Sequence, residues 1–345
     1  MGRVIGFRVD ANEYVASGHL MRCITIAKAC VKKGNKCVFF LAEEKMTERL
    51  VQNELPYCIV SSKWNDMEAE YSDLAMLLKQ QTIELLVVDS YQASKKYLEM
   101  LNNVLPVCYI DDMGKETYDI DMILHYGSWD NCHEFEARYA KTQTKILEGM
   151  QYAPLREEFA QDGDDVEREK SILITTGGTD PYNISGKVVK ELLKRESCSD
   201  YRLKVIVGSM NSNITALEEL LIDKRVELLR NVNNMGELMR TSQYAVSAGG
   251  TTLLELCASG IPTVCFSFAE NQEKGCDKMG VNQIMLYAGD ARKVADIHVI
   301  IADKIEQFIK NQALSKLYVD NMQKLVDGQG ARRIAETLVT LGKDR

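Results

Sequence analysis

The feature that most constrains the fold is the regular alternation of short, apolar, β-rich runs with amphipathic helical patterns along the 345 residues. Strands that are apolar throughout and separated by helices are typical of a parallel sheet with helices on both faces. In the first half the predicted strands are RVIGFRVD, KCVFFLA, YCIVSS, LLVVDS, VCYIDD and DMILHYG. In the second half they are SILITTGG, RLKVIVG, VELLRNV, YAVSAGG and TVCFSFA, followed by helices from about Val294 to Gly342.

The alternation is interrupted by the segment AQDGDDVEREK, which is acidic, polar and without hydrophobic periodicity. Such a segment indicates a linker, and a chain of this length exceeds the usual size of one hydrophobic core. We therefore predict an N-terminal domain over 1–149, a linker over 150–170 and a C-terminal domain over 171–345. The expected fold class is α/β, with two doubly wound Rossmann-like domains and an interdomain cleft.

The first helix is predicted from apolar residues at helical spacing, namely Leu20, Ile24, Ala27 and Val31. Gly34 follows this run and is expected to end the helix.

Composition excludes several classes of protein. No run approaches the roughly 20 apolar residues that cross a bilayer, and the N-terminus lacks the pattern of a signal peptide. The net charge of −8 gives no general attraction to nucleic acid or anionic lipid. The ten cysteines are scattered, with no C-x-x-C pair, as in reduced proteins. We expect a cytoplasmic protein without stable membrane insertion or a nucleic-acid partner.

Two glycine-rich turns follow predicted strands of the second half, where ligands of α/β sheets bind. In SAGGTTLLE, Gly249 and Gly250 precede Thr251 and Thr252, whose helix start is a potential anion site, and Glu255 lies one turn further. A glycine turn with a threonine cap and a solvated glutamate explains this stretch equally well.

The other turn, TTGGTDPYN, contains Gly177 and Gly178 and precedes a helix expected to be capped by Asn183 or Ser185. Neither turn fits the Walker A or dinucleotide fingerprint. Two such turns in one domain favour a phosphate-bearing ligand.

His19 follows Gly18 where the first loop becomes a helix. A lone histidine at a helix start is more often a surface residue, but this position lies at the carboxyl end of the first predicted strand. A histidine there can exchange protons near neutral pH, and the helix N-terminus favours its neutral form.

Three further features are ambiguous. The stretch HYGSWDNCHEFE contains potential metal ligands (His125, Asp130, Cys132, His133, Glu134 and Glu136) without a recognised zinc spacing, and a polar surface loop is the preferred interpretation. Asp111 and Asp112 either line the ligand site or cap the next turn. Tyr91, after VVDS, has the same two interpretations.

Together these blocks resemble the nucleotide-sugar hydrolases of pseudaminic acid biosynthesis, relatives of the glycosyltransferase that makes lipid II. RVDANEYVASGHLMRC is similar to the family's N-terminal signature. The blocks VVDSY, IDD, YAPLREEF, TTGGTDPYN, SAGGTTLLE, GIPTVCFSFAENQ and DGQGARRI follow in the family's order. The resemblance covers almost the whole chain.

The resemblance implies a glycosyltransferase-B-type fold and hydrolysis of UDP-2,4-diacetamido-2,4,6-trideoxy-β-L-altropyranose, without a cofactor or metal. It implies that His19 activates water. The sugar-side residues implied are Tyr91, Asn271, Gly18 and Asp10. The UDP-side residues implied are Gly177, Gly178, Gly249, Gly250, Thr251, Thr252 and Glu255.

Two positions depart from the family pattern, Ser90 in place of the usual histidine and Ala16 in place of a glycine. Both lie on the implied sugar side, so they leave the exact sugar open. The oligomeric state is also open. Two other functions fit the same residues: a glycosyltransferase with a soluble or lipid-linked acceptor, and a non-catalytic nucleotide-sugar sensor.

Overall fold

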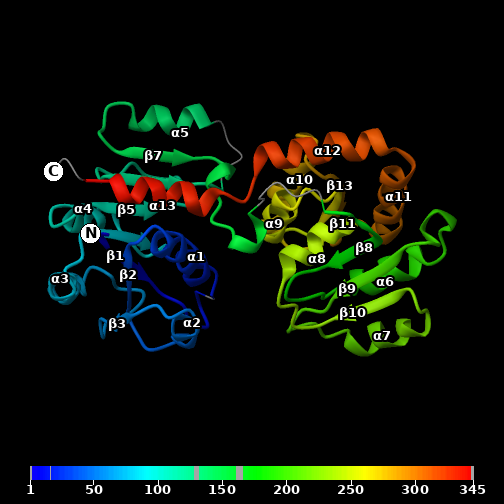
Figure 1. Cartoon of the computed structure of the whole chain (residues 1–345), viewed down its shortest axis with the longest axis horizontal. Helices are drawn as coiled ribbons and strands as arrows, with labels where there is room; N and C mark the ends of the chain where they lie inside the picture. Colours follow the sequence, from blue (N-terminus) through cyan, green and yellow to red (C-terminus); the bar gives the residue numbers. More distant parts are fainter. Residues whose placement is uncertain (1, 16, 128–131, 161–165, 343–345) are drawn as a thin grey trace. The chain divides into compact units, whose positions relative to one another are not determined.

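The computed structural model describes residues 2–15, 17–127, 132–160 and 166–342, with the side chains of 132–134 left aside. The chain divides into two compact units (Figure 1). Unit 1 comprises Met1–Arg156 and Gln329–Arg345, and unit 2 comprises Glu157–Gly328. Each unit is a parallel α/β domain, as the alternation of strands and helices predicts.

Unit 1 contains a parallel sheet whose seven described strands run in the order β3-β2-β1-β4-β5-β6-β7. The strands are β1 Val4–Val9, β2 Lys36–Leu41, β3 Tyr57–Ile59, β4 Leu85–Asp89, β5 Val107–Ile110, β6 Met122–His125 and β7 Lys145–Glu148. The helices are α1 Gly18–Lys32, α2 Glu48–Gln52, α3 Tyr71–Gln80, α4 Lys95–Asn102, α5 Cys132–Tyr139 and α13 Gly330–Thr340, with a 3₁₀ turn at Met150–Tyr152.

Unit 2 has six described parallel strands in the order β10-β9-β8-β11-β12-β13. The strands are β8 Glu169–Thr175, β9 Arg202–Ile206, β10 Val226–Leu229, β11 Ser242–Ala248, β12 Thr263–Ser267 and β13 Leu286–Asp290. The helices are α6 Ile184–Leu192, α7 Ile214–Glu218, α8 Met235–Thr241, α9 Thr252–Ala258, α10 Glu270–Val281, α11 Ile297–Lys310 and α12 Gln312–Leu325. Short 3₁₀ turns lie at Glu157–Phe159, Glu196–Cys198 and Glu219–Ile222.

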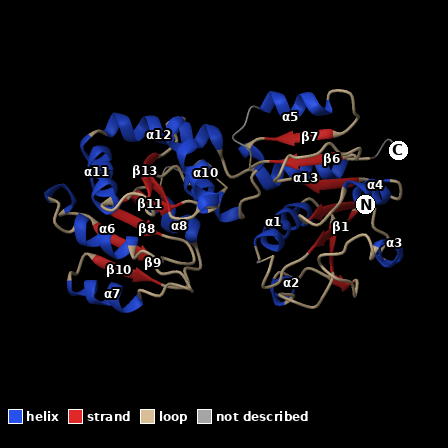
Figure 2. Cartoon of the chain, turned by 180° about the vertical axis from the view of Figure 1, so that it is seen from behind, coloured by secondary structure: helices blue, strands red, loops and turns tan. Residues whose placement is uncertain are grey.

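Helices lie on both faces of each sheet, as seen from behind in Figure 2. In unit 1, α3, α4 and α5 contribute to the apolar core on one face, which includes Leu74, Leu98 and Phe135. In unit 2, α6 and α11 contribute to a core that includes Val188 and Phe308. Every strand predicted from the sequence is present, whereas β7 and β13 were not predicted.

The first helix is confirmed, with one error in its buried face. Leu20, Ile24 and Ala27 are buried, but Val31 is 46% exposed. Gly34 adopts φ +81° and its amide donates to the Val31 carbonyl, so it ends the helix as predicted.

The predicted boundary of the second domain is wrong for the last helix. α13 returns to unit 1 and packs beside α1, as Figure 1 shows. Its buried face includes Ile334 and Leu338, and the guanidinium of Arg3 donates to the Leu338 carbonyl at 3.3 Å. An apolar helix face must be buried, but helical periodicity does not specify which core buries it.

The boundary between the units falls inside the predicted linker, between Arg156 and Glu157. β8 begins at Glu169, within the last two residues assigned to that linker. Apart from the partly exposed Cys58, the described cysteines are buried free thiols. No helix in the described part of the chain combines the length and apolarity that crossing a membrane requires.

Candidate functional site

His19 is the second residue of α1, directly after the loop that leaves the carboxyl end of β1. The side-chain oxygen of Asn12 accepts hydrogen bonds from the amides of Tyr14 and Val15, both at 2.9 Å, and so fixes this loop. His19 itself is 8% exposed. The loop therefore places the largely buried imidazole of His19 at the carboxyl edge of the unit 1 sheet.

The imidazole contacts Asp89, the last residue of β4. β1 and β4 are adjacent and parallel, with Val9 opposite Asp89, so the loop after β1 and the end of β4 share one edge. His19 Nδ1 lies 2.6 Å from Asp89 Oδ1. A separation this short between a nitrogen and a carboxylate oxygen requires a proton between them.

Arg22 stands one helical turn after His19 and binds the same carboxylate. Its Nε and Nη2 donate to the two oxygens of Asp89 at 2.6 and 2.5 Å. Complete burial alone would raise the pKa of Asp89, but the hydrogen bonds and charge of Arg22, and then His19, hold it below its usual value. Asp89 thus stays ionised beside His19 Nδ1, and Arg22 Nη2 lies 3.0 Å from the same nitrogen. An ionised carboxylate at this position can accept a proton from Nδ1, and in that tautomer Nε2 is the proton acceptor.

The same guanidinium extends the network to β5. Arg22 Nη1 donates to both oxygens of Asp112 at 3.0 and 2.8 Å and to the hydroxyl of Tyr126 at 2.8 Å. The hydroxyl of Tyr91 donates to Asp112 Oδ2 at 2.9 Å. The Tyr91 ring lies edge-to-face against His19, with centroids 4.6 Å apart. Four segments of unit 1 therefore meet around His19.

Asp111 and Asp112 have different environments, although they are neighbours in the sequence. Asp111 is fully buried, and its Oδ1 accepts from the amides of Met113 and Gly114 at 2.9 Å each. Asp111 therefore caps the next turn, whereas Asp112 belongs to the His19 network. The capping alternative is thus confirmed for Asp111, whereas a place for Asp112 at a ligand site stays a prediction.

Asp10 is buried in a separate polar cluster. Arg8 donates to Asp10 Oδ2 at 2.6 Å and to both oxygens of Glu70 at 2.6 and 2.8 Å. Asp10 Oδ1 accepts from the amide of Ala42 at 2.8 Å. This arrangement ties the start of the first loop to the residue that follows β2, and the implied place of Asp10 on the sugar side stays a prediction.

Gly18 has no atom within 4 Å of the place where a Cβ would stand. Packing within the protein therefore does not require glycine here. The position directly before His19 therefore borders open space.

In unit 2 the two glycine turns lie side by side, because β8 and β11 are adjacent, with Thr175 opposite Ser247. Gly177 has φ +75° and Gly250 has φ +142°, backbone conformations that favour glycine. A Cβ at Gly249 would come within 2.7 Å of Cys276 Sγ, whereas one at Gly178 would meet only the end of Met210, at 3.2 Å. Glycine is thus favoured by the backbone conformation at Gly177 and Gly250 and by close packing at Gly249.

The helices that follow the two turns begin differently. Asp180 accepts from the amides of Ile184 and Ser185 at 2.8 and 3.0 Å and so caps α6. The cap predicted for Asn183 or Ser185 is therefore wrong, since Asn183 occupies the N-cap position without a side-chain hydrogen bond.

The helix α9 begins directly after the turn that contains Gly249 and Gly250. Thr251 is its exposed N-cap residue, Thr252 is its first residue, and Glu255 is partly buried one turn later. Asn271, the second residue of α10, is exposed on the same unit.

Sequence reasoning missed Asp89 and Arg22 as members of the site. The signals were present: an aspartate ends an apolar strand in LLVVDS, and Arg22 lies three residues after His19 on the same helix face. Ala16 and Asp130 lie outside the described residues, as do the side chains of Cys132, His133 and Glu134. Among the remaining described residues, no three His, Cys, Asp or Glu side chains group in a way that could hold a metal ion.

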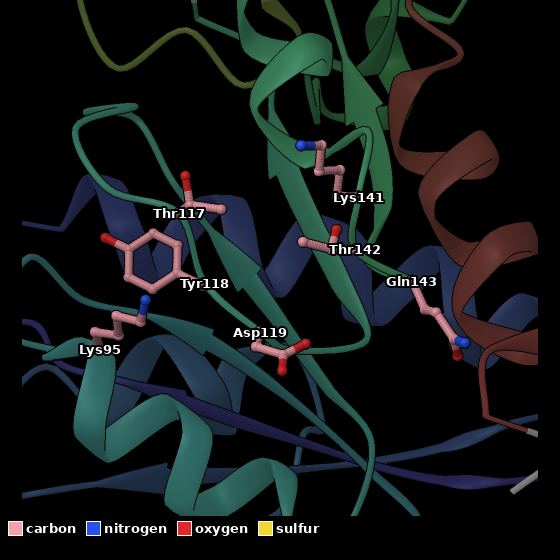
Figure 3. Close-up of a pocket in the computed structure, with 7 residues that line it drawn as sticks. All are labelled: Lys95, Thr117, Tyr118, Asp119, Lys141, Thr142 and Gln143. Atoms are coloured by element: carbon pink, nitrogen blue, oxygen red, sulfur yellow. The ribbon is translucent and has the colours of Figure 1, made fainter.

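Unit 1 also has a pocket of about 530 Å³ (Figure 3). Its lining comes from the start of α4 and from the segments before β6 and β7, namely Lys95, Thr117, Tyr118, Asp119, Lys141, Thr142 and Gln143. Lys95 pairs with Glu99 at 3.7 Å. No predicted site residue lines this pocket, so it is separate from the His19 network.

A known family model matches most of unit 2 and the larger part of α13. Residues 171–338 match the model of the glycosyltransferase family 28 C-terminal domain. The chain carries a glycosyltransferase family 28 C-terminal domain. The two glycine turns, α9 and Asn271 all lie within the matched residues.

The chain is 24% identical, over 274 residues, to a UDP-2,4-diacetamido-2,4,6-trideoxy-beta-L-altropyranose hydrolase of Campylobacter jejuni. This match covers 77% of the chain and 92% of the relative. The resemblance stated from the motifs is thus confirmed.

Two solved structures share the fold. MurG of Acinetobacter baumannii has a TM-score of 0.66 at 11% identity, covering 97% of this chain and 98% of the other. The pneumococcal O-GlcNAc transferase GtfA, in complex with UDP and GlcNAc, has a TM-score of 0.64 at 10% identity, covering 98% of both chains. The chain therefore has the predicted glycosyltransferase-B fold.

Proposed function

We propose that the protein hydrolyses a UDP-activated 2,4-diacetamido-trideoxy sugar to free sugar and UDP, as a step in pseudaminic acid biosynthesis. The observation that carries this proposal is the 2.6 Å contact between His19 Nδ1 and the ionised Asp89, which favours the tautomer in which Nε2 accepts a proton. The similarity to the Campylobacter jejuni hydrolase supports the choice of substrate.

In this mechanism His19 Nε2 accepts a proton from water while the water oxygen attacks the anomeric carbon. Asp89 stabilises the imidazolium that forms and keeps its ring in place. General base catalysis by a positioned side chain typically contributes about 10²–10⁴ in rate. The bond from the anomeric carbon to the phosphate oxygen breaks, and its electron pair leaves with UDP.

The UDP side of the reaction is assigned to unit 2. The turns at Gly177 and Gly249 allow the backbone to approach the diphosphate, and the start of α9 at Thr251 and Thr252 offers amides to the charge that develops on it. Glu255 is proposed to bind a ribose hydroxyl. Tyr91, Asn271 and Gly18 are proposed to face the sugar, while Asp10 holds the first loop.

The test is release of UDP from a panel of UDP-sugars with no acceptor present. We expect UDP release from the diacetamido-trideoxy sugar and little from UDP-N-acetylglucosamine. A glycosyltransferase, which the family 28 domain also fits, would release UDP only when an acceptor is added. A sensor would bind the UDP-sugar and leave it intact.

A further inference from the structure

The exposed ring of Tyr91 packs against the imidazole of His19, the proposed base. The Tyr91 and His19 rings meet edge-to-face at 4.6 Å and an interplanar angle of 86°. Tyr91 is 56% exposed, whereas only 10% of the His19 side chain is exposed. An exposed ring therefore lies over a nearly enclosed imidazole.

The hydroxyl of Tyr91 is held in place by a hydrogen bond. It donates to Asp112, which is itself held by the guanidinium of Arg22. Burial, and then the charge of Asp112, raise the pKa of Tyr91, so the phenol remains a donor.

The backbone before Tyr91 is also fixed. Ser90 Oγ accepts from the amide of Gln92 at 3.1 Å, and the Ser90 carbonyl accepts from the hydroxyl of Tyr109 at 3.3 Å. An aromatic ring that is more than half exposed gains little from apolar burial. These hydrogen bonds, rather than core packing, therefore account for its fixed position.

Access to His19 limits what can serve as the nucleophile. The attacking group must give its proton to Nε2, and nine-tenths of the His19 side chain is already covered by protein. Any contact with substrate can only reduce this access further. A water molecule needs the least space, whereas an alcohol must also fit its carbon beside an imidazole that the Tyr91 ring already contacts.

We infer that Tyr91 is the specificity-determining residue that restricts the nucleophile to water and excludes alcohols. This inference rests on the proposed hydrolysis. Under this inference, the Tyr91 side chain, which is held by its hydrogen bond to Asp112, decides between hydrolysis and glycosyl transfer.

The excluded reaction uses the same base. Methanol would lose its hydroxyl proton to His19 Nε2 while its oxygen bonds to the anomeric carbon. The bond between that carbon and the phosphate oxygen would break, and UDP would leave with the electron pair. The products would be a methyl glycoside and UDP, with the proton released to solvent.

The experiment measures how the sugar partitions between water and methanol in a mixture that does not alter thermal unfolding. Mass spectrometry quantifies free sugar and methyl glycoside, and total UDP is measured in parallel. The variants are Tyr91→Ala, Tyr91→Leu and Tyr91→Phe. Tyr14→Ala is the matched control, because Tyr14 is also exposed on unit 1 but stacks on Trp64.

The parent protein and the Tyr14→Ala control are expected to give free sugar almost exclusively. Tyr91→Ala and Tyr91→Leu should raise the proportion of methyl glycoside by about 10- to 200-fold, the usual range for discrimination over one methyl-sized group. Tyr91→Phe keeps the ring but loses the hydrogen bond to Asp112, so its proportion of methyl glycoside should lie between those of the parent and Tyr91→Ala.

Three results would overturn the inference. The first is methyl glycoside from the parent in proportion to the methanol supplied. The second is an unchanged partition in both ring-deleted variants. The third is complete loss of turnover in both, which would place Tyr91 in the chemical step itself. If the parent releases no UDP without an acceptor, the proposed hydrolysis fails instead.

Discussion

Replacing Asp89 with asparagine tests how the structure prepares His19 as a base. The substitution keeps the shape of the side chain but removes its charge, and its amide NH₂ can then donate to His19 Nδ1. The imidazole proton would move to Nε2, the nitrogen that must accept a proton from water. We expect kcat/KM to fall by about 10²–10⁴, the usual contribution of general base catalysis.

The same substitution affects stability through Arg22. Removing one partner of a buried ion pair costs about 3–5 kcal/mol. Arg22 keeps Asp112 and Tyr126 as partners, so we expect a loss near the lower end, about 3 kcal/mol. A domain of ordinary stability, about 5–15 kcal/mol, stays folded after such a loss.

The assay is the rate of UDP release, measured below the onset of thermal unfolding. Asp111→Asn is the matched control, because Asp111 is equally buried at the end of the neighbouring strand but accepts only from backbone amides. An asparagine oxygen can still accept these bonds, so this variant should remain active. A folded Asp89→Asn variant with activity within a few-fold of the parent would refute the role given to Asp89.

Three further predictions concern His19, Glu255 and the position at which water attacks. His19→Asn should abolish turnover while leaving UDP affinity, measured by calorimetry, within a few-fold of the parent, because the proposed UDP site is on unit 2; near-full activity would remove His19 from the mechanism. Glu255→Ala should weaken UDP binding by about one to two decades, since a hydrogen bond to a charged group contributes about 1.5–3 kcal/mol; unchanged binding would contradict the ribose contact. In ¹⁸O-water with excess EDTA the label should appear on the free sugar, read before ring-opening exchange, whereas label on phosphate or loss of activity to the chelator would contradict attack at carbon.

The glycine turns show what local sequence can predict about a site. Their place after apolar strands could be read directly, because strand periodicity and glycine conformation are local properties. That the two turns lie side by side depends on the pairing of β8 with β11, which no local pattern specifies.

The network around His19 shows more clearly what local sequence cannot predict. His19 and Asp89 are 70 residues apart in the sequence, and Arg22 and Asp112 are 90 apart. They meet because β1, β4 and β5 are consecutive in the sheet, an order set by packing of the whole domain. Asp10, which stands closer to His19 in the sequence, is bound instead by Arg8, in a cluster that buries three charged side chains.

The sequence alone determined the α/β class, the two-domain organisation, the strand-to-helix turns and the place of His19 at a helix start. These features depend on the period of apolar residues and on the backbone preferences of glycine, both of which act over a few residues. Tertiary structure decided the return of α13 to unit 1, the capping of α6 by Asp180 and the convergence of Asp89, Arg22, Asp112 and Tyr91 on His19. An amphipathic helix or a charged side chain requires a partner, but only the packed sheet determines which distant segment supplies it.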